Sequence, residues 1–417
     1  MRIIDYQGIQ LRQRRRAKKR KLVRRGFIVL VLMVFSLTYG YISFQLPLPV
    51  AEASTRVITT DSSQPTNIVW PGYGQAAIGN PEYGLLEVNG AQETAPTASV
   101  AKIMTALAVL RKKPIIQGEA MPRIVIDEVD IASYNYYLNN DGSNVRVELG
   151  QELTEYQALQ ALLLPSANNI SETLARWAFG SLDAYATYAN DLARSLGMKN
   201  SFFAEPSGFS PRTVSTAQDL VLLGLAALNE PIIVEIMAQT SATLPVAGEI
   251  RNTNRVLGQA GIIGMKTGNT DEAGGCFMAA GTTTVGGRKI TTVAVIMGAP
   301  TVGRAMSDSV PLLSSAHQNY QEVTVLKANQ QVADYAFSWG AQNTSYIKDD
   351  QTILTWRGSD ITVSLRAEPI DVDKPSGSVV GTALISTPLQ KKSAPLHIQS
   401  TSALPDVSWR LKRVVGL

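Results

Sequence analysis

Residues 97–106 read TASVAKIMTA, and they place a hydroxyl and an amine, those of Ser99 and Lys102, at the start of an apolar run. Side chains three positions apart lie on one face of a helix, so a helix over residues 97–110 would bring the two groups together. The apolar neighbours would desolvate the lysine and favour its neutral form. A neutral amine beside a hydroxyl is a general base for a serine nucleophile. The alternative is a lysine without a catalytic role, whose ammonium reaches water along a half-exposed helix.

A second polar group follows 67 residues after Ser99, in the sequence LLLPSANN. Its Ser166 and Asn168 lie in a break between two apolar segments, 154–164 and 171–179, that are both predicted to be helices. Polar side chains at such a break must find hydrogen bonds in the interior or line a cavity. An ordinary helix end followed by the N-cap of the next helix would also explain them.

The tripeptide Lys266-Thr267-Gly268 occurs once, another 100 residues after Ser166, in a segment predicted to be rich in strands. A lysine there supplies positive charge for a substrate carboxylate, and the threonine hydroxyl can bind the same anion. Because Gly268 has no side chain, a substrate backbone would be able to lie against the strand. A plain hairpin strand is the alternative explanation.

The order S-x-x-K, S-x-N, K-T-G is the motif set of penicillin-binding proteins and class A β-lactamases. With the segments PTASVAKIMTA, LLLPSANN, LGMKNSFF, STAQDL and GMKTGNTDEAGGCFMAAG, residues 75–300 resemble the D-alanyl-D-alanine carboxypeptidases, the low-molecular-mass penicillin-binding proteins of serine peptidase family S11. The resemblance implies an enzyme that removes the terminal D-alanine from peptidoglycan stem peptides through an acyl-enzyme, binds β-lactam inhibitors and uses no cofactor or metal. It also implies an α+β fold: a β-lactamase/transpeptidase-like antiparallel sheet flanked by helices, followed by a small all-β C-terminal domain.

The resemblance assigns catalytic roles to the first two motifs. Ser99 would be the acylated nucleophile, and Lys102 its general base. Ser166 would relay protons toward the leaving D-alanine, while Asn168 would hold the peptide amide.

The third motif would bind the substrate. Lys266 and Thr267 would receive the terminal carboxylate of the peptide, beside Gly268. The backbone N–H groups of Ser99 and Asn269 would form the oxyanion hole.

Two other functions compete with this one. A β-lactamase adds a glutamate that activates a deacylating water, and Glu205 in FAEPSGF follows Ser166 by 39 residues. However, the E-P-E-L-N-like continuation is absent, and EPSGF is closer to the N-P-H-G-L of the carboxypeptidases. A non-catalytic cell-wall-binding protein would be indicated by the loss of a motif residue, and every motif residue is present.

Charge and rare residues exclude several other classes. Residues 1–25 hold eleven Lys or Arg against one acid, and the rest of the chain carries a net charge of −6, which argues against a nucleic-acid partner. The single cysteine, Cys276, excludes an intramolecular disulfide and multi-cysteine metal sites. The two histidines, His317 and His397, have no ligand spacing, so a zinc site or a Ser-His-Asp triad is poorly supported.

An uncharged run of 19 residues, GFIVLVLMVFSLTYGYISF at 26–44, is long enough to cross a bilayer. Ten positive charges at 12–25 precede it, so the N-terminus is expected in the cytoplasm and the catalytic domain outside, on a single-pass cell-membrane anchor. Cleavage after Ala53 in AEA is the alternative, but the run exceeds the roughly 7–15 apolar residues of a secretory signal.

These observations divide the chain into five predicted parts. They are a basic cytoplasmic tail at 1–25, a transmembrane signal anchor at 26–44, a Pro-, Ser- and Thr-rich linker at 45–66, a serine peptidase catalytic domain at 67–320 and a β-rich C-terminal domain at 321–417.

Overall fold

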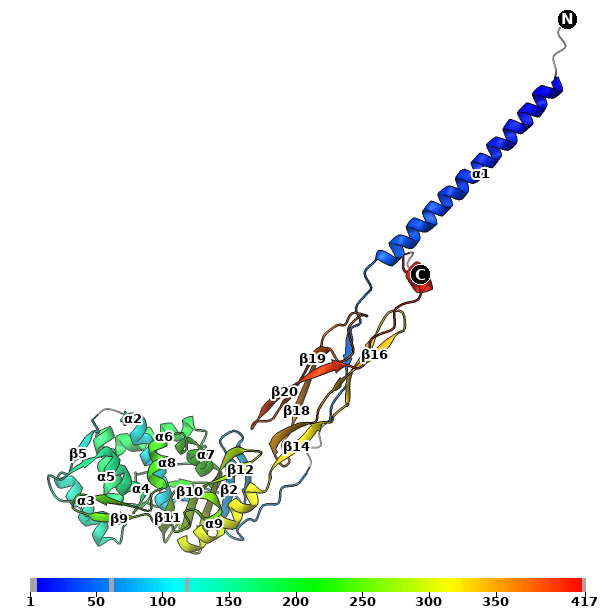
Figure 1. Ribbon diagram of the computed structural model, residues 1–417. Helices are drawn as coiled ribbons and strands as arrows, with labels where there is room; N and C mark the ends of the chain where they lie inside the picture. The colour runs from blue at the N-terminus through cyan, green and yellow to red at the C-terminus, as the bar shows by residue number, and fades with distance from the viewer. Residues whose placement is uncertain (1–5, 60–63, 117–119, 415–417) are drawn as a thin grey trace.

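The computed structural model describes residues 6–59, 64–116 and 120–414, and the molecule is elongated (Figure 1). A long helix stands at one end, a β-rich unit lies in the middle, and a larger unit of helices and sheet lies at the other end. Residues 1–5 of the predicted tail and 60–63 of the predicted linker lie outside the described residues.

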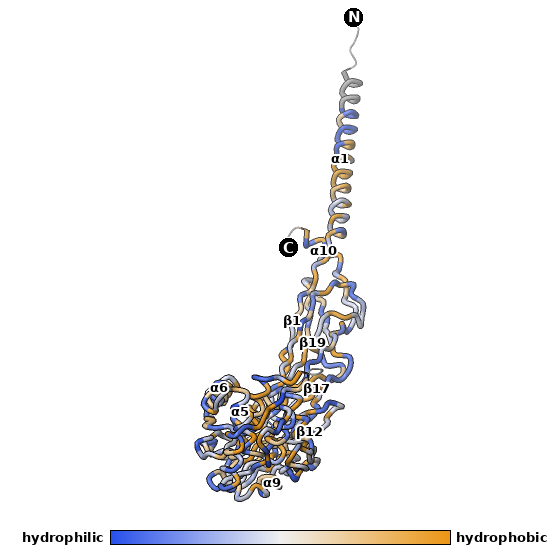
Figure 2. The backbone as a smooth tube through the Cα atoms, turned by 90° about the vertical axis from the view of Figure 1, so that its left-hand side faces the viewer, coloured by the Kyte–Doolittle hydropathy of each residue, from blue (hydrophilic) through white to orange (hydrophobic). Residues whose placement is uncertain are grey.

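The long helix, α1 (Tyr6–Gln45), continues from the basic tail through the whole apolar run without a break. Its apolar side chains between Phe27 and Phe44 are mostly exposed, so the described part of the chain leaves them largely uncovered. Figure 2 shows most of this helix standing apart from the rest of the molecule. Among the described residues it is the one unbroken helix that is long and apolar enough to cross a membrane. Its hydrogen-bonded backbone and uncovered apolar surface are what a bilayer-spanning segment requires.

The central sheet of the larger unit is antiparallel. Its strands run in the order β10 (Ile262–Gly264), β12 (Gly274–Val285), β13 (Arg288–Ala299), β2 (Gln75–Asn80) and β3 (Gly84–Asn89), with β11 (Thr267–Thr270) beside one end of β12. Successive side chains of a strand point to opposite faces, and Ala76 and Ile78 accordingly join one apolar cluster while Ala77 joins the other. Both faces of the sheet are therefore covered.

Helix α9 (Val302–His317) covers one face of the sheet, and a bundle of helices covers the other. The helix expected at 97–110 begins with a 3-10 turn, η1 (Ala98–Ala101), and continues as α2 (Lys102–Lys112). Every side chain from Lys102 to Leu110 is buried, which explains why this helix lacks a polar face. The bundle also holds α3 (Glu128–Asn139), α4 (Glu155–Leu163), α5 (Asn168–Phe179), α6 (Leu182–Ser195), α7 (Ala217–Ala227) and α8 (Pro231–Met237).

Short strand pairs fix the loops around the bundle. They are β4 (Ala95–Pro96) with β7 (Val214–Ser215), β5 (Arg123–Val125) with β6 (Glu152–Thr154), and β8 (Ser241–Leu244) with β9 (Gly248–Arg251), and a further turn is η2 (Gln259–Gly261). Two of these pairs adjoin segments that carry predicted site residues, because β4 precedes η1 and β9 precedes β10 and β11.

The C-terminal unit holds a second antiparallel sheet with its own apolar core. Its strands run in the order β1 (Ala53–Thr55), β15 (Gln331–Ala336), β16 (Gln342–Ile347), β20 (Lys391–Ile398), β19 (Val379–Ser386) and β18 (Thr362–Ala367), and β14 (Tyr320–Leu326) pairs separately with β17 (Gln351–Trp356). The prediction of an α+β chain with an antiparallel sheet between helices and a β-rich C-terminal part is confirmed.

The structure differs from the prediction within the segment expected to be a linker, 45–66. Strand β1 pairs with β15, and Arg56 forms an ion pair with Asp334 at 2.7 Å. Residues just after the long helix thus complete the edge of a sheet built almost entirely from the C-terminal quarter of the chain. The local composition does not predict this edge strand, because its partner strand lies about 280 residues away in the sequence.

A short helix, α10 (Val407–Arg413), ends the described chain and is an addition to the expected all-β part. It packs against the end of α1: the Arg413 guanidinium donates to the carbonyl of Pro47 at 2.7 Å, and Arg410 lies over the ring of Phe44 at 5.0 Å. The C-terminal unit therefore meets the long helix at the place where the apolar run ends (Figure 1).

Candidate active site

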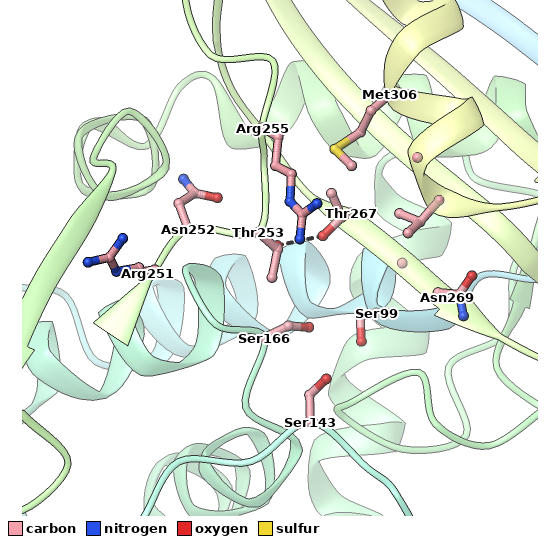
Figure 3. Close-up of a pocket in the computed structure, with 13 residues that line it drawn as sticks. Ser99, Ser143, Ser166, Arg251, Asn252, Thr253, Arg255, Thr267, Asn269 and Met306 are labelled. Atoms are coloured by element: carbon pink, nitrogen blue, oxygen red, sulfur yellow. Dashed lines mark hydrogen bonds between the residues drawn. The ribbon is translucent and has the colours of Figure 1, made fainter. Parts of the chain in front are cut away.

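A cavity of about 560 Å³ opens beside η1 and β11. The predicted site residues that line it are Ser99, Ser166, Thr267, Gly268 and Asn269. The predicted site residues that are almost fully buried and do not belong to the lining are Lys102, Asn168 and Lys266. Figure 3 shows the side chains of Ser99 and Ser166 directed into the same space.

Ser99 is held at the cavity by a strained turn. The preceding residue, Ala98, has a φ of 45°, in the left-handed region that costs an L-amino acid on the order of 1–3 kcal/mol. A loop backbone packs closely on this turn at Gly208, where a Cβ would stand 1.9 Å from the carbonyl oxygen of Ala98. Only a glycine lets the loop approach so closely, and this packing fixes the turn that presents the Ser99 hydroxyl.

Lys102 lies behind Ser99 and makes three hydrogen bonds. Its Nζ donates to Ser99 Oγ at 2.8 Å, to Asn168 Oδ1 at 2.6 Å and to the carbonyl of Ser207 at 2.7 Å. The expected meeting of the amine and the hydroxyl is confirmed. The alternative of an ammonium that reaches water is wrong, because the side chain is 0% exposed.

The surroundings of Lys102 favour its neutral form. Burial, and then the nearby charge of Lys266, hold the pKa of Lys102 well below its usual range, and Glu205 opposes them only in part. Amide and backbone carbonyl oxygens accept hydrogen bonds but cannot donate them. In neutral Lys102 the two remaining N–H groups are therefore taken by Asn168 and Ser207, and the lone pair is left facing Ser99, the one partner of the three that can give up a proton.

The second motif supplies one residue to the cavity and one to the lysine. Ser166 has a φ of 68°, and its buried Oγ lacks a hydrogen-bond partner within the described part of the chain. A buried hydroxyl without a hydrogen bond lowers the stability of the fold, and at a cavity wall it can bind a ligand. Asn168 gives its carboxamide oxygen to Lys102, and its backbone N–H donates to the carbonyl of Ser143 at 2.7 Å. Its role in holding a peptide amide stays a prediction.

The third motif also has one residue at the cavity, Thr267, and one behind its wall, Lys266. Thr267 lines the cavity, and its hydroxyl lies 2.6 Å from that of Thr253. Lys266 is 1% exposed, donates from Nζ to the carbonyl of Thr267 at 2.9 Å, and has its pKa lowered to about 7 by burial. Its ammonium thus lies beneath the wall of the cavity.

Gly268 has a structural reason in addition to the expected one, which stays a prediction. A Cβ at this position would stand 3.0 Å from the backbone nitrogen of Ser99 and 3.0 Å from the carbonyl oxygen of Thr97. The missing side chain makes room for the turn that carries Ser99, so the packing of the protein itself favours glycine here. Strand β11 is thereby packed directly against η1.

Glu205, the one candidate for a β-lactamase glutamate, is occupied within its own loop. Its carboxylate accepts hydrogen bonds from the backbone N–H of Ser207 at 2.6 Å, from the hydroxyl of Thr213 at 3.2 Å, and from two further groups of the loop. It does not belong to the cavity lining. These bonds shape the turn whose Ser207 carbonyl accepts from Lys102, so the glutamate acts on the lysine through the loop as well as through its charge.

Sequence reasoning missed several residues of the site. Those that line the cavity are Ser143, Arg251, Asn252, Thr253, Arg255, Val302, Gly303 and Met306. The segment RNTNR at 251–255 is a polar run just before the third motif, and this proximity is the one signal that the sequence offered. Among the described residues, no group of three or more His, Cys, Asp or Glu side chains is placed to hold a metal ion.

The comparisons with known proteins agree with this geometry. The family model described as D-alanyl-D-alanine carboxypeptidase matches residues 84–301, just over half of the chain. The D-alanyl-D-alanine carboxypeptidase DacF of Bacillus subtilis (strain 168) is 27% identical over 286 residues, which are 66% of this chain and 70% of that protein. The D-alanyl-D-alanine endopeptidase of Escherichia coli (strain K12) is 32% identical over 194 residues, and this chain spans only 58% of its length.

Solved structures show the same fold. Penicillin binding protein 5 from Haemophilus influenzae has a TM-score of 0.57 at 20% identity, over 82% of this chain and 99% of that one. The Streptomyces K15 DD-transpeptidase has a TM-score of 0.52 at 24% identity, over 58% of this chain and 96% of that one. The first likeness extends into the C-terminal sheet, and the second covers a shorter part of the chain. The predicted transpeptidase-like fold is confirmed.

Proposed function

This chain belongs to the D-alanyl-D-alanine carboxypeptidase family of serine peptidases, and we propose that Ser99 is the residue on which it forms its acyl-enzyme. The predicted function, a serine-type D-Ala-D-Ala carboxypeptidase that also binds penicillin, is confirmed by the family match and by its relatives. The two alternatives, a β-lactamase and a non-catalytic cell-wall-binding protein, are not favoured.

The observation that carries the assignment is the environment of Lys102. A general base needs a lone pair; burial lowers the pKa of Lys102 and so favours its neutral form, in which Asn168 and Ser207 occupy the two N–H groups. Ser99 lies 2.8 Å from Nζ and lines the cavity, so the lone pair points at a hydroxyl that a substrate can reach.

The reaction then takes the following course. Ser99 Oγ attacks the carbonyl carbon between the two D-alanines, and its proton passes to Lys102 Nζ. The oxyanion accepts hydrogen bonds from the backbone N–H groups of Ser99 and Asn269. Proton transfer through Ser166 to the amine of the terminal D-alanine breaks the peptide bond, which leaves an ester on Ser99 that water hydrolyses.

Penicillin follows the same first step, because its lactam carbonyl takes the place of the peptide carbonyl. Attack by Ser99 opens the ring, and the leaving amine stays tethered to the acyl group. Glu205 is engaged in its loop and does not line the cavity, so it is not placed to activate water against this ester. The acyl-enzyme with penicillin is therefore long-lived.

The proposed membrane anchor places the catalytic unit where it can reach peptidoglycan. Helix α1 crosses the cell membrane once with its basic end in the cytoplasm, and the catalytic unit lies outside the cell, where stem peptides are exposed. Protease added to intact spheroplasts should remove the catalytic unit and leave an N-terminal fragment. A soluble, secreted protein that begins at Ser54 would replace the anchor by a cleaved signal.

Mass spectrometry of the purified chain tests the assignment. Exposure to penicillin should add one acyl group, and peptide mapping should find it on Ser99. Exposure to a pentapeptide ending in D-Ala-D-Ala should release one D-alanine. An adduct on another serine, such as Ser345, or none on folded protein, would contradict the role of Ser99, and an adduct that hydrolyses within seconds would favour a β-lactamase.

A further inference from the structure

The N-terminal part of α1 carries a dense cluster of positive charge that no step of the proposed reaction uses. Residues 14–25, which we call the basic segment, hold nine Lys or Arg side chains in twelve positions and no acid. All nine are exposed, and none has an ion pair within the described ranges 6–59, 64–116 and 120–414. Figure 2 shows this hydrophilic stretch directly before the apolar stretch of the same helix.

The basic segment has no apolar face. Its three uncharged side chains are Ala17, Leu22 and Val23, and at 3.6 residues per turn they point about 100–140° apart around the helix axis. A helix that lies flat on a membrane needs an apolar stripe, and the centre of a protein interface is depleted of charge. The basic segment therefore favours a partner that binds by charge and surrounds the helix.

Anionic lipid headgroups meet both conditions, because lipid surrounds a lone membrane-spanning helix on all sides. Helix α1 continues without a break through Gly26, so the basic segment extends the axis of the apolar run. At 1.5 Å per residue its twelve residues reach about 18 Å beyond that run. Headgroups occupy about 5–8 Å outside the hydrocarbon, and the attraction of a charged surface persists for about another 8 Å at physiological ionic strength. Most of the basic segment thus lies within reach of the charge of the inner leaflet.

We propose that the basic segment binds a shell of anionic phospholipid headgroups in the inner leaflet, and so holds the anchor in membrane regions that are rich in these lipids. The inference rests on the proposed membrane assignment. The positive-inside rule accounts for the side of the membrane on which the segment lies. Its density reaches the about four to eight Lys or Arg that bind anionic headgroups beside a membrane-spanning helix. The guanidinium groups pair with two phosphate oxygens at once, and the ammonium groups add charge.

The other end of the apolar run provides a comparison within the same molecule. Helix α10 carries Arg410, Lys412 and Arg413 there. Two of these three cations are already engaged by the protein, because Arg410 donates to the carbonyl of Phe44 at 3.5 Å and Arg413 to that of Pro47 at 2.7 Å. The basic segment is therefore the better candidate for binding lipid by charge.

Spin-labelled lipids test the proposal on the full-length protein in phosphatidylcholine vesicles. A nitroxide lipid beside a membrane-spanning helix is motionally restricted, and its electron paramagnetic resonance spectrum gives its association constant relative to other lipids. A phosphatidylglycerol probe should associate at least about threefold more strongly than a phosphatidylcholine probe in about 0.05 M salt. The ratio should fall close to one in about 1 M salt, where charges are screened beyond about 3 Å.

Replacing Lys18, Lys19 and Lys21 together by glutamine should lower this ratio at least about twofold. Glutamine is a good helix former, so the helix itself is retained. An unchanged ratio in the triple variant would overturn the proposal, and so would a preference that survives the high salt. A preference that a short DNA duplex or an acidic peptide abolishes at an equal concentration of charge would identify a soluble partner instead.

The matched control removes the same charge from three exposed lysines of the catalytic unit, Lys112, Lys199 and Lys289, and should keep the wild-type ratio. Penicillin should acylate both triple variants as it does the wild type, because the basic segment and the catalytic unit lie at opposite ends of the molecule (Figure 1). Mass spectrometry of the intact chain separates the two ways of failing. A chain that begins at Ser54 overturns the membrane anchor together with the inference, whereas a chain that keeps residues 14–25 and shows no lipid preference overturns the inference alone.

Discussion

Replacing Asn168 by aspartate tests whether the neutral form of Lys102 is the catalytic base. The Asn168 oxygen lies 2.6 Å from Lys102 Nζ, and the side chain is almost fully buried. Asn168→Asp keeps the shape and the acceptor but adds a negative charge at this distance. The Coulomb attraction at an effective dielectric constant of 20 is about 6 kcal/mol in favour of the ammonium, before the cost of burying the carboxylate.

The sign of the effect follows from the protonation state that reacts. A carboxylate beside Lys102 raises the pKa of the lysine, so a smaller fraction of the enzyme is neutral at pH 7. Acylation by a fluorescent penicillin, followed by stopped flow, should therefore be slower than in the wild type by at least about a hundredfold at pH 7. The rate should rise steadily as the pH is increased to 10, because more of the lysine loses its proton.

Asn168→Ala provides the contrast, since it removes the acceptor without adding a charge. Its acylation should be slower by about tenfold, the value of one net hydrogen bond that holds Lys102 in place, and raising the pH should not restore it. The reasoning is refuted if Asn168→Asp shows the pH profile of the wild type. It is also refuted if both variants lose the same activity at every pH, because the asparagine would then act by packing alone.

Three further predictions concern the neighbours of this pair. Lys266→Met removes a charge that lowers the pKa of Lys102, so that pKa should rise and the acid limb of the acylation profile should move to higher pH; an unchanged limb would mean that the two lysines are not electrostatically coupled. Gly268→Ala places a Cβ 3.0 Å from the Ser99 nitrogen, and it should slow penicillin acylation at least tenfold in a protein that still melts cooperatively. Gly287→Ala is the control: no atom lies within 4 Å of its Cβ position and φ is 74°, so this substitution should change stability only. Glu205→Gln leaves several loop hydrogen bonds weakened and should lower the melting temperature by several degrees, while the lifetime of the penicillin acyl-enzyme stays within about twofold of the wild type; a much longer lifetime would identify Glu205 as a water activator after all.

The motifs could be predicted from the sequence because each is a local pattern with its own chemistry. Ser99 and Lys102 are three residues apart, and a helical turn brings them together whatever the rest of the chain does. The order of the three motifs then identified the family, and with it the α+β fold and the reaction. A membrane-spanning helix at 26–44 could also be predicted, because the thickness of the membrane sets the number of apolar residues that a spanning helix needs.

The roles within the motifs depended on distances between segments that are far apart in the chain. No pattern in the sequence predicts that Asn168 faces Lys102, that Lys266 is buried beneath the cavity wall, or that Gly268 makes room for the turn at Ser99. Each of these facts is set by how closely β11, η1 and α5 pack against one another. Contacts between segments that are distant in the sequence produce no periodic pattern along it.

The sequence by itself determined which reacting groups this protein has and on which side of a membrane they are expected. Only the tertiary structure decided which of those groups face the cavity and which lie behind its wall, and it added Arg255 and strand β1, which no motif contains. The physical reason is that hydrogen-bonding groups and charges act over a few ångströms. Their effect on pKa and on binding is therefore settled by packing between remote segments rather than by spacing along the chain.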